Sequence, residues 1–168
     1  MERFFKMKIV FSQNQQLSQK NAEIIATKWH YDGEYSFYDM ENDQEDYDEI
    51  ITPALRKDHY FEVLADDGQL TAFFCLDPIE DRNGQVEVGL GMAPELTGHG
   101  LGIKLMQMIE DYVKQIGKYH KIILSVAEFN KRAQKVYQRA GYRITGSEDE
   151  ASNGGIYRFI LMAKEIKK

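Results

Sequence analysis

A glycine-rich loop near the middle of the chain constrains its fold more than any other stretch. Gly98, Gly100 and Gly102 stand at every second position, after a strand-like run and directly before an amphipathic helical pattern. Glycine admits positive φ and lets a ligand approach bare backbone N–H groups. The start of a helix adds unpaired N–H donors and the positive end of the macrodipole. The sequence therefore predicts a strand, loop and helix that together seat a phosphate group.

Spacing excludes the two most common phosphate-binding loops. A P-loop counted from Gly98 needs its second glycine at the position that Ile103 occupies. A dinucleotide fingerprint counted from Gly98 fails at the same residue, and one counted from Gly100 fails at Leu105. What remains is the pattern Thr97-x-x-Gly100-x-Gly102, and a second motif downstream decides its meaning.

That second motif runs from residue 130 to residue 142 and predicts a short amphipathic helix. Asn130 is a good N-cap, and Gly141 stands where a C′ residue would end the helix. Between them, four side chains recur at the i, i+3, i+4, i+7 spacing of one helix face, namely Ala133, Val136, Tyr137 and Ala140.

Taken in order, about thirty residues apart with a strand between them, the two motifs resemble the GNAT superfamily (GCN5-related N-acetyltransferases). In that family, Arg/Gln-x-x-Gly-x-Gly/Ala cradles the pyrophosphate of coenzyme A, and the later motif carries a cofactor-contacting Asn and a tyrosine near the thioester sulfur. The clear match runs roughly from Val86 to Tyr142. Thr97 replaces the usual Arg or Gln, which predicts a weaker side-chain contact to the pyrophosphate but leaves the backbone donors intact.

The resemblance implies acetyl-CoA as the cofactor and no metal site. His99 is expected to contribute its backbone N–H, with its ring directed to solvent. Asn130 could serve the helix as an N-cap, contact the cofactor, or do both. The cofactor-binding set implied in this way consists of Leu90, Gly91, Met92, Thr97, Gly98, His99, Gly100, Leu101, Gly102, Asn130 and Tyr137.

The rest of the sequence predicts an α/β fold in a single domain over residues 1–168, with a mixed, mostly antiparallel sheet and flanking helices. The dipeptides Asp67-Gly68 and Asn83-Gly84 are hairpin signals. A helical crossover makes strands 85–92 and 122–126 parallel. The resemblance implies a GNAT-like acyl-CoA N-acyltransferase fold in which these two strands splay apart around the pantetheine arm. The other expected strands are 8–11, 60–65, 70–76, 142–146 and 156–162, and the expected helices are 17–29, 100–115 and the motif helix.

Two residues are candidates for catalysis. Glu87 shares one strand face with Gly89 and Gly91, and partial desolvation there would raise its pKa toward that of a useful general base. The alternative is an exposed strand residue or a structural ion pair. Tyr137 lies where the resemblance implies a departing thiolate, and a phenol is a credible acid for that group. Its alternative is an ordinary core tyrosine.

The acceptor side is less constrained by the sequence. Seven of the eleven residues from 39 to 49 are acidic. Such a segment could form an acidic wall that attracts a cationic amine, or it could be a solvated surface. The aromatic residues just before it could line an amine pocket through cation–π contacts or pack a loop against the sheet. They are Trp29, Tyr31, Tyr35, Phe37 and Tyr38.

Composition limits the partners. A formal net charge of −6 argues against sequence-independent nucleic-acid binding, and no apolar run approaches the length of a membrane span, about 20 residues. The single cysteine, Cys75, excludes an internal disulfide and fits the reducing cytoplasm. It is expected to be a buried apolar residue rather than a nucleophile.

The sequence and the resemblance together predict a cytoplasmic, acetyl-CoA-dependent N-acetyltransferase that acts on a primary amine of a small cationic molecule. Two alternatives remain open at this point. One is a protein or peptide N-acetyltransferase with the same chemistry, and the other is a non-catalytic acyl-CoA-binding regulatory module. Many relatives dimerise, so a homodimer is among the expected states, although no stretch of the sequence identifies an interface.

Overall fold

Seven strands form one sheet in the order β1-β2-β3-β4-β5-β7-β6 within residues 8–167, the part of the chain that this computed structural model describes. Neighbouring strands pair antiparallel except for β4 and β5, which are parallel. This confirms the mixed, mostly antiparallel sheet. The strands are β1 (Gln13–Gln16), β2 (Tyr60–Leu64), β3 (Leu70–Pro78), β4 (Gln85–Met92), β5 (Lys121–Ala127), β6 (Arg143–Ser152) and β7 (Gly155–Glu165).

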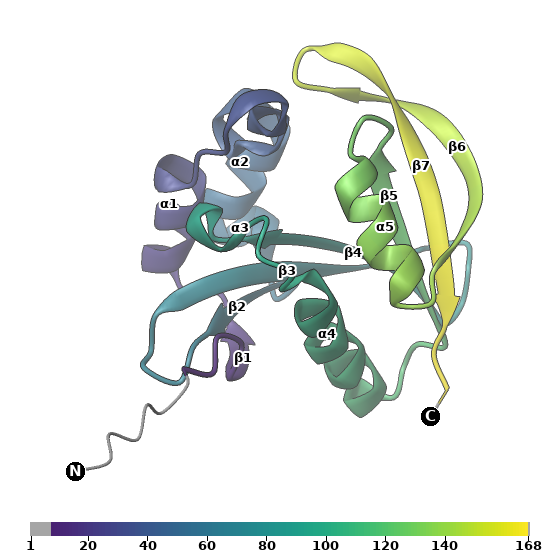
Figure 1. Ribbon diagram of the computed structural model, residues 1–168, viewed down its shortest axis with the longest axis horizontal. Helices are drawn as coiled ribbons and strands as arrows, with labels where there is room; N and C mark the ends of the chain where they lie inside the picture. Colours follow the sequence, from purple (N-terminus) through teal and green to yellow (C-terminus); the bar gives the residue numbers. More distant parts are fainter. Residues whose placement is uncertain (1–7, 168) are drawn as a thin grey trace.

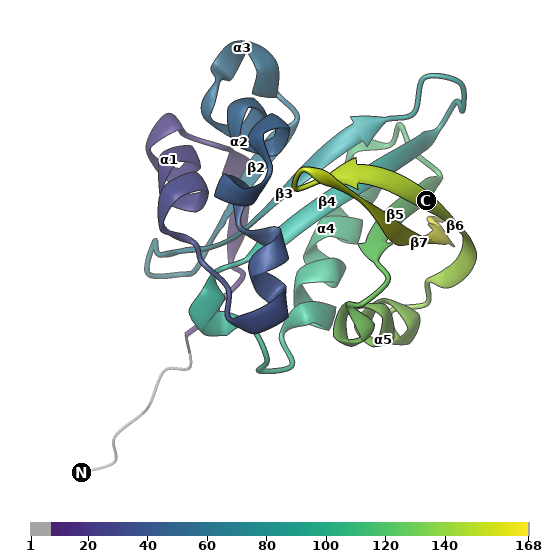
Figure 2. The same ribbon diagram turned by 90° about the horizontal axis from the view of Figure 1, so that it is seen from above.

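Helices cover both faces of the sheet. In Figures 1 and 2, α1, α2 and α3 lie on one face, and α4 and α5 lie on the other. The helices are α1 (Gln19–Lys28), α2 (Gln44–Ile51), α3 (Pro53–Arg56), α4 (Gly102–Ile116) and α5 (Lys131–Arg139). Short 3-10 turns, η1 (Gly33–Tyr38), η2 (Met40–Asn42) and η3 (Pro94–Leu96), connect them. Among the described residues, no helix combines the length and the apolarity needed to cross a membrane.

Two hydrophobic cores follow from the alternation of side chains along the central strands. On β3, Phe74 and Leu76 face the α4 side and join the larger core. Phe73 and Cys75 face the α1 side and join the second core, which includes Ile25 of α1. The sheet thus separates the molecule into an α4/α5 side and an α1/α2 side, and each side has its own packed interior.

The parallel pairing of β4 with β5 is short. It covers only the register pairs from Gln85↔Lys121 to Glu87↔Ile123, although β4 continues to Met92 and β5 to Ala127. The rest of β4 keeps its pairing with β3 on the other edge. The two strands therefore splay apart after Glu87, as the resemblance implied.

One predicted strand is wrong and several ends differ. The expected strand at residues 8–11 is irregular backbone, and β1 instead consists of the polar residues Gln13–Gln16, which pair with Phe61–Leu64. β1 lies at the edge of the sheet, where pairing depends on the partner strand more than on apolar side chains. The terminal hairpin is also longer than expected, because β6 extends to Ser152 and β7 starts at Gly155.

An ion pair with a buried carboxylate joins β7 to α4 and to the end of α5. Lys164 of β7 donates from Nζ to Oε1 of Glu110 at 2.6 Å and to the Ala140 carbonyl oxygen at 2.7 Å. Glu110 is only 5% exposed, so its carboxylate depends on this partner for compensation of its charge.

We expect Lys164→Met to lower the free energy of unfolding by about 2–3 kcal/mol, because it leaves a buried carboxylate unpaired. Lys8→Met is the matched control. Lys8 pairs with Asp67 at 3.1 Å on an exposed surface, so its loss should cost less than about 1 kcal/mol. Urea unfolding of both variants measures the difference, and equal losses would contradict a stabilising role for the buried pair.

Candidate active site

The glycine-rich loop joins β4 to α4 through η3, and its backbone has the conformation that the sequence predicts. Gly98 and Gly100 have φ values of +77° and +74°, which L side chains rarely adopt. The ring of His99 lies at an exposed position. The hydroxyl of Thr97 donates to the Pro94 carbonyl oxygen at 2.8 Å, so this side chain stabilises the turn and leaves ligand contacts to the backbone.

Gly102 has a different role, because it allows α4 and α5 to approach closely. A Cβ atom at Gly102 would lie 2.9 Å from Cγ1 of Val136 on α5. The first turn of α4 therefore packs directly on α5, and the start of α5 lies beside the glycine-rich loop.

Arg132, in the first turn of α5, is a residue whose role the sequence analysis missed. Its Nη1 lies 3.7 Å from the position that a Cβ atom would take at Gly98. Its guanidinium carbon lies 4.2 Å from the centre of the Tyr35 ring, a cation–π contact. The available signal was its place two residues after the N-cap Asn130, on the turn that faces the loop. It brings a positive charge to the loop that Thr97 cannot supply.

The gap between β4 and β5 exposes backbone groups. At the two ends of the β3–β4 pairing, the Ala93 N–H donates to the Thr71 carbonyl oxygen and the Ile79 N–H donates to the Gln85 carbonyl oxygen. The odd-numbered residues of β4 therefore direct their backbone groups to β3. By alternation, the even-numbered residues Val88, Leu90 and Met92 direct theirs toward β5. Beyond Val88, the backbone groups of Leu90 and Met92 have no ladder partner on β5.

One of the exposed carbonyls has a substitute partner. The hydroxyl of Tyr31 donates to the Met92 carbonyl oxygen at 2.8 Å. The Leu90 N–H, by contrast, points into the gap between β4 and β5. Leu90 and its neighbour Gly91 are among the expected cofactor-binding residues.

The second motif places Asn130 and Tyr137 on the α4/α5 side. Asn130 is buried, and its Oδ1 accepts from the Ala133 N–H at 3.1 Å, which confirms the N-cap. Its Nδ2 donates to the Tyr38 hydroxyl at 3.0 Å. Tyr137 packs against the larger core, and burial raises the pKa of its hydroxyl, with a smaller contribution from Tyr38. The hydroxyl therefore stays protonated at neutral pH.

Glu87 lies on the opposite, α1/α2 side of the sheet, where it shares a face with Asp77, its register partner on β3. Burial raises the pKa of Glu87, and the charges of Glu150, Asp77 and Glu148 raise it further. Glu150 reaches this face from β6 and accepts a hydrogen bond from the Ser125 hydroxyl at 2.9 Å. A half-buried carboxylate surrounded by other carboxylates is suited to holding a proton taken from a cation.

Several acids of the segment from 39 to 49 have structural roles. Asp39 accepts from the Tyr31 N–H at 2.8 Å, and Asp43 caps α2 by accepting from the Asp46 N–H at 3.2 Å. Asp46 keeps an exposed surface, but surrounding protein raises its pKa to about 6, with further contributions from Asp43 and other acids of the same segment. The segment is thus ordered by hydrogen bonds to its acids, and its neighbouring charges raise the pKa of Asp46.

The predicted aromatic cluster separates into two groups. Trp29 is buried in the second core, where its ring centre lies 6.1 Å from that of Phe73. Tyr35, Phe37 and Tyr38 instead pack with rings from the β5–α5 loop and β7, which are Phe129, Tyr157 and Phe159. These ring contacts attach η1 to the β5–α5 loop and to β7.

Neither Cys75 nor the hollow beside α4 contributes to the site. Cys75 is 8% exposed and burial raises the pKa of its thiol strongly, which confirms it as a buried residue and disfavours a thiolate nucleophile. A hollow of about 380 Å³ lies between α4 and the start of β1, and none of the predicted site residues line it. Among the described residues, no group of three or more His, Cys, Asp or Glu side chains could hold a metal ion.

Solved structures with a similar fold include acetyltransferases. The spermidine N-acetyltransferase of Vibrio cholerae in complex with CoA and spermine superposes with a TM-score of 0.66 at 21% identity, covering 92% of this chain and 95% of that one. An acetyltransferase of the GNAT family from Streptococcus pneumoniae gives a TM-score of 0.62 at 18% identity, covering 92% and 99%. At these identities the likeness concerns the fold.

Curated relatives match over part of their length. An uncharacterized N-acetyltransferase of Methanocaldococcus jannaschii is 31% identical over 83 residues, which are 49% of this chain and 52% of the relative. The 5-NmdU N-acetyltransferase of Pseudomonas phage PaMx11 is 25% identical over 87 residues, 52% of this chain and 59% of the relative. The chain thus spans just over half the length of the curated relatives that it matches.

The family assignment rests on a longer match. The model of the acetyltransferase (GNAT) family matches residues 23–142. This range includes the glycine-rich loop, the splayed strands, Glu87 and the whole second motif. The chain belongs to the acetyltransferase (GNAT) family.

Proposed function

We propose that this chain is an acetyl-CoA-dependent N-acetyltransferase whose acceptor is a primary amine of a small cationic molecule. The observation that carries the proposal is the position of Glu87. It lies at the point where β4 and β5 separate, among Asp77, Glu148 and Glu150, which raise its pKa. An acidic environment attracts a protonated amine, and a carboxylate with a raised pKa can remove its proton. The Vibrio cholerae relative, which binds CoA and spermine, supports an acceptor of this kind.

Acetyl-CoA is the acetyl donor of the family, and several features of this chain fit it. The positive φ angles at Gly98 and Gly100 and the start of α4 suit a pyrophosphate. Arg132 adds a cation beside Gly98, in place of the Arg or Gln that Thr97 replaces. The backbone groups of β4 that face the gap suit the amides of a pantetheine arm.

The residues have distinct roles in this proposal. The cofactor supplies an acetyl group activated as a thioester. Glu87 accepts the proton of the acceptor ammonium, directly or through a water, so that the free amine can form the new N–C bond. The Leu90 N–H stabilises the carbonyl oxygen as negative charge develops on it. Tyr137 donates its proton to the sulfur as the C–S bond breaks.

The arrangement favours direct transfer. Glu87 and Tyr137 lie on opposite sides of the sheet, and the gap between β4 and β5 is where the two sides meet. An acyl-enzyme would need a nucleophile in this gap. Cys75 lies in the second core on β3 with a strongly raised pKa, and so does not supply one.

Thiol release from acetyl-CoA across a panel of amines and short peptides tests the proposal. We expect release that depends on linear, cationic primary amines, above a blank without acceptor that corrects for hydrolysis and for Cys75. A protein that binds acetyl-CoA but transfers to no amine or peptide would contradict the proposal and favour a non-catalytic binding module.

The glycine-rich loop provides a test of cofactor binding. Gly100→Ala should weaken acetyl-CoA binding by roughly fivefold to thirtyfold. A side chain at this positive φ costs about 1–2 kcal/mol of strain. The free loop therefore leaves the conformation that binds the cofactor, and binding must restore it. Gly117→Ala is the matched control, because its φ is +76° and its added Cβ atom also meets open space, but it lies at the far end of α4. Calorimetric titration with acetyl-CoA distinguishes the two. Equal affinities would remove the loop from the cofactor site.

Substitution of the two catalytic candidates tests their roles. We expect Glu87→Gln to lower kcat/KM for the amine by about 100-fold or more, and Tyr137→Phe by at least about tenfold. Glu80→Gln and Tyr119→Phe are matched controls outside the site. Acetyl-CoA affinity should change little in Glu87→Gln, because the carboxylate faces the acceptor side. Unchanged turnover in both variants would refute the residue assignment.

The pH dependence of kcat/KM tests the ionisation of Glu87. A base acts in its ionised form, so activity should be full above its pKa and fall as the pH drops through it. Burial and neighbouring acids raise that pKa, which places the fall above the ordinary glutamate value of about 4.3. Asp77→Asn removes one neighbouring charge and should move the fall to lower pH. An acidic limb unchanged in Asp77→Asn and in Glu87→Gln would belong to another group.

A further inference from the structure

The segment between α1 and α2 contacts both sides of the gap between β4 and β5. The Tyr31 hydroxyl donates to the Met92 carbonyl oxygen, at the end of β4, at 2.8 Å. The Tyr38 hydroxyl accepts at 3.0 Å from Nδ2 of Asn130, the residue that caps α5 just after β5. One short stretch, residues 31–38, therefore spans the gap from its β4 side to its β5 side.

On the β4 side, Tyr31 bonds a backbone group that the ladder leaves without a partner. The Met92 carbonyl lies beyond the last pairing of β4 with β5, and by alternation it is directed toward the gap. Burial raises the pKa of the Tyr31 hydroxyl, and the charges of Asp39 and Glu95 raise it further. The hydroxyl therefore keeps its proton at neutral pH and remains a donor to this carbonyl.

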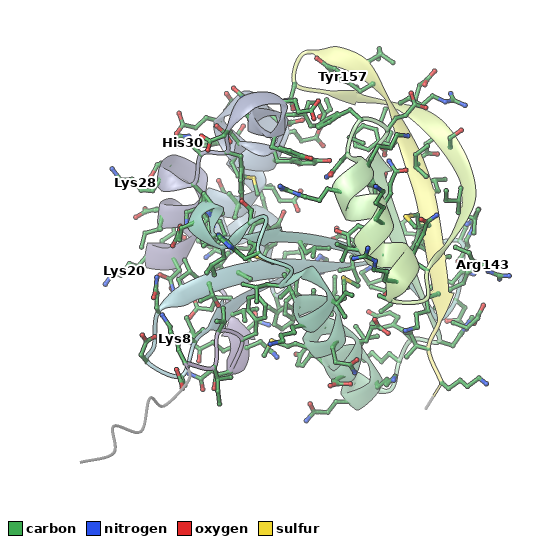
Figure 3. All side chains as sticks on the ribbon, viewed as in Figure 1. Lys8, Lys20, Lys28, His30, Arg143 and Tyr157 are labelled. Atoms are coloured by element: carbon green, nitrogen blue, oxygen red, sulfur yellow. The ribbon has the colours of Figure 1, made fainter. Side chains whose placement is uncertain are left out.

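Tyr31 is itself fixed to the end of α1. Its N–H donates to Oδ1 of Asp39 at 2.8 Å, and Nδ1 of His30 lies 3.2 Å from Oδ2 of the same carboxylate. Nε2 of His30 lies 3.0 Å from the Thr27 carbonyl oxygen in α1. Figure 3 shows His30 close to Lys28, at the end of that helix. The tyrosine thus has a support that does not belong to the sheet.

On the β5 side, aromatic rings reinforce the hydrogen bond from Asn130 to Tyr38. The ring centre of Phe129 lies 5.5 Å from that of Phe37 and 5.9 Å from that of Tyr38. The tip of the β6–β7 hairpin, which Figure 1 shows curled toward α2, adds a bond from Nδ2 of Asn153 to the Phe37 carbonyl oxygen at 2.8 Å. Burial raises the pKa of the Tyr38 hydroxyl although the bond from Asn130 opposes the rise, so the phenol is neutral at neutral pH.

The ladder between β4 and β5 fixes only the closed end of the gap. Its three register pairs end at Glu87, whereas Met92 and Asn130 lie at the open end, where the two strands have parted. The turn η1 connects the two tyrosines and is held by its own hydrogen bonds. We call residues 31–38 the brace, because they tie the two walls of the gap to one another where the ladder does not.

We propose that Tyr31 and Tyr38 are positioning residues for the cofactor, and that their hydroxyls hold the two walls of the gap at the separation that the pantetheine arm requires. The inference rests on the proposed function, which assigns this gap to the arm. Neither tyrosine has to touch the reacting atoms. A gap that is already held open at the right width in the free protein reduces the ordering that binding would otherwise cost.

Removing the two hydroxyls separately and together tests the brace. Tyr31→Phe and Tyr38→Phe keep the rings and remove only the hydrogen bonds to Met92 and Asn130. Tyr47→Phe is the matched control. Tyr47 is a half-buried tyrosine of α2 that packs on the second core and not on either wall of the gap.

The measurement uses two ligands, acetyl-CoA and adenosine 3′-phosphate 5′-diphosphate, which is the part of CoA without the pantetheine arm. Affinities come from calorimetric and displacement titration, and Tm is recorded for every variant. We expect each single variant to weaken acetyl-CoA binding by about threefold to tenfold and to change the affinity for the fragment by less than about twofold. Tyr47→Phe should change neither affinity.

The double variant tests whether the two bonds act as one device. A brace fails when either end is released, so Tyr31→Phe/Tyr38→Phe should weaken acetyl-CoA binding about as much as the more damaging single variant does. Two independent contacts would instead give the product of the two single losses, and that result would overturn the brace.

The other outcomes separate this inference from the proposed function. Acetyl-CoA affinity that is unchanged or higher in both single variants would refute the positioning role and leave the N-acetyltransferase intact. Equal losses for acetyl-CoA and for the fragment would refute it as well, because they would indicate damage beyond the gap. If the natural protein binds no acetyl-CoA, the proposed function fails and the inference fails with it.

Discussion

The early separation of β4 from β5 is the constraint on which the rest of the site depends. Three register pairs hold the strands together, and beyond Glu87 the strands part. A continuous ladder would occupy the Leu90 N–H and close the sheet between the two packed sides. The gap instead brings a loop that suits phosphate and a half-buried tyrosine from one side toward a carboxylate from the other. In the proposed reaction, the α4/α5 layer supports the cofactor side of the site and the α1/α2 layer supports the acceptor side.

Much of this organisation is encoded locally and could be predicted. The alternation along 85–92, the helical spacing in 130–141 and the glycines at 98 and 100 each report a backbone conformation directly. Glu87 could be assigned a raised pKa because its strand neighbours are glycines, although the acids of β6 that raise it further were invisible. The strand at 8–11 failed because an edge strand is chosen by its partner, and β2 pairs with four polar residues instead.

The curl of the β6–β7 hairpin and the hydrogen bonds at its tip lay beyond sequence reasoning for a physical reason. Nearly every residue of β6 is exposed, so its sequence has no alternation to indicate which face it covers. The bonds from Asn153 to Phe37 and Asp43 join segments more than a hundred residues apart. Asn153-Gly154 predicts a turn, but no local pattern identifies the segment that the turn contacts.

The contact between Arg132 and Tyr35 connects the glycine-rich loop with the η1 segment. Arg132 stands beside the loop that suits a phosphate, and Tyr35 belongs to η1, whose rings pack on the β5–α5 loop and β7. The face of a guanidinium can stack on an aromatic ring while its N–H edge bonds an anion, so one side chain can make both contacts. An anion that displaced Arg132 would also disturb its contact with Tyr35, and thermodynamic reciprocity would then couple the loop and the η1 segment equally in both directions. One side chain thus connects two segments that lie almost a hundred residues apart in the sequence.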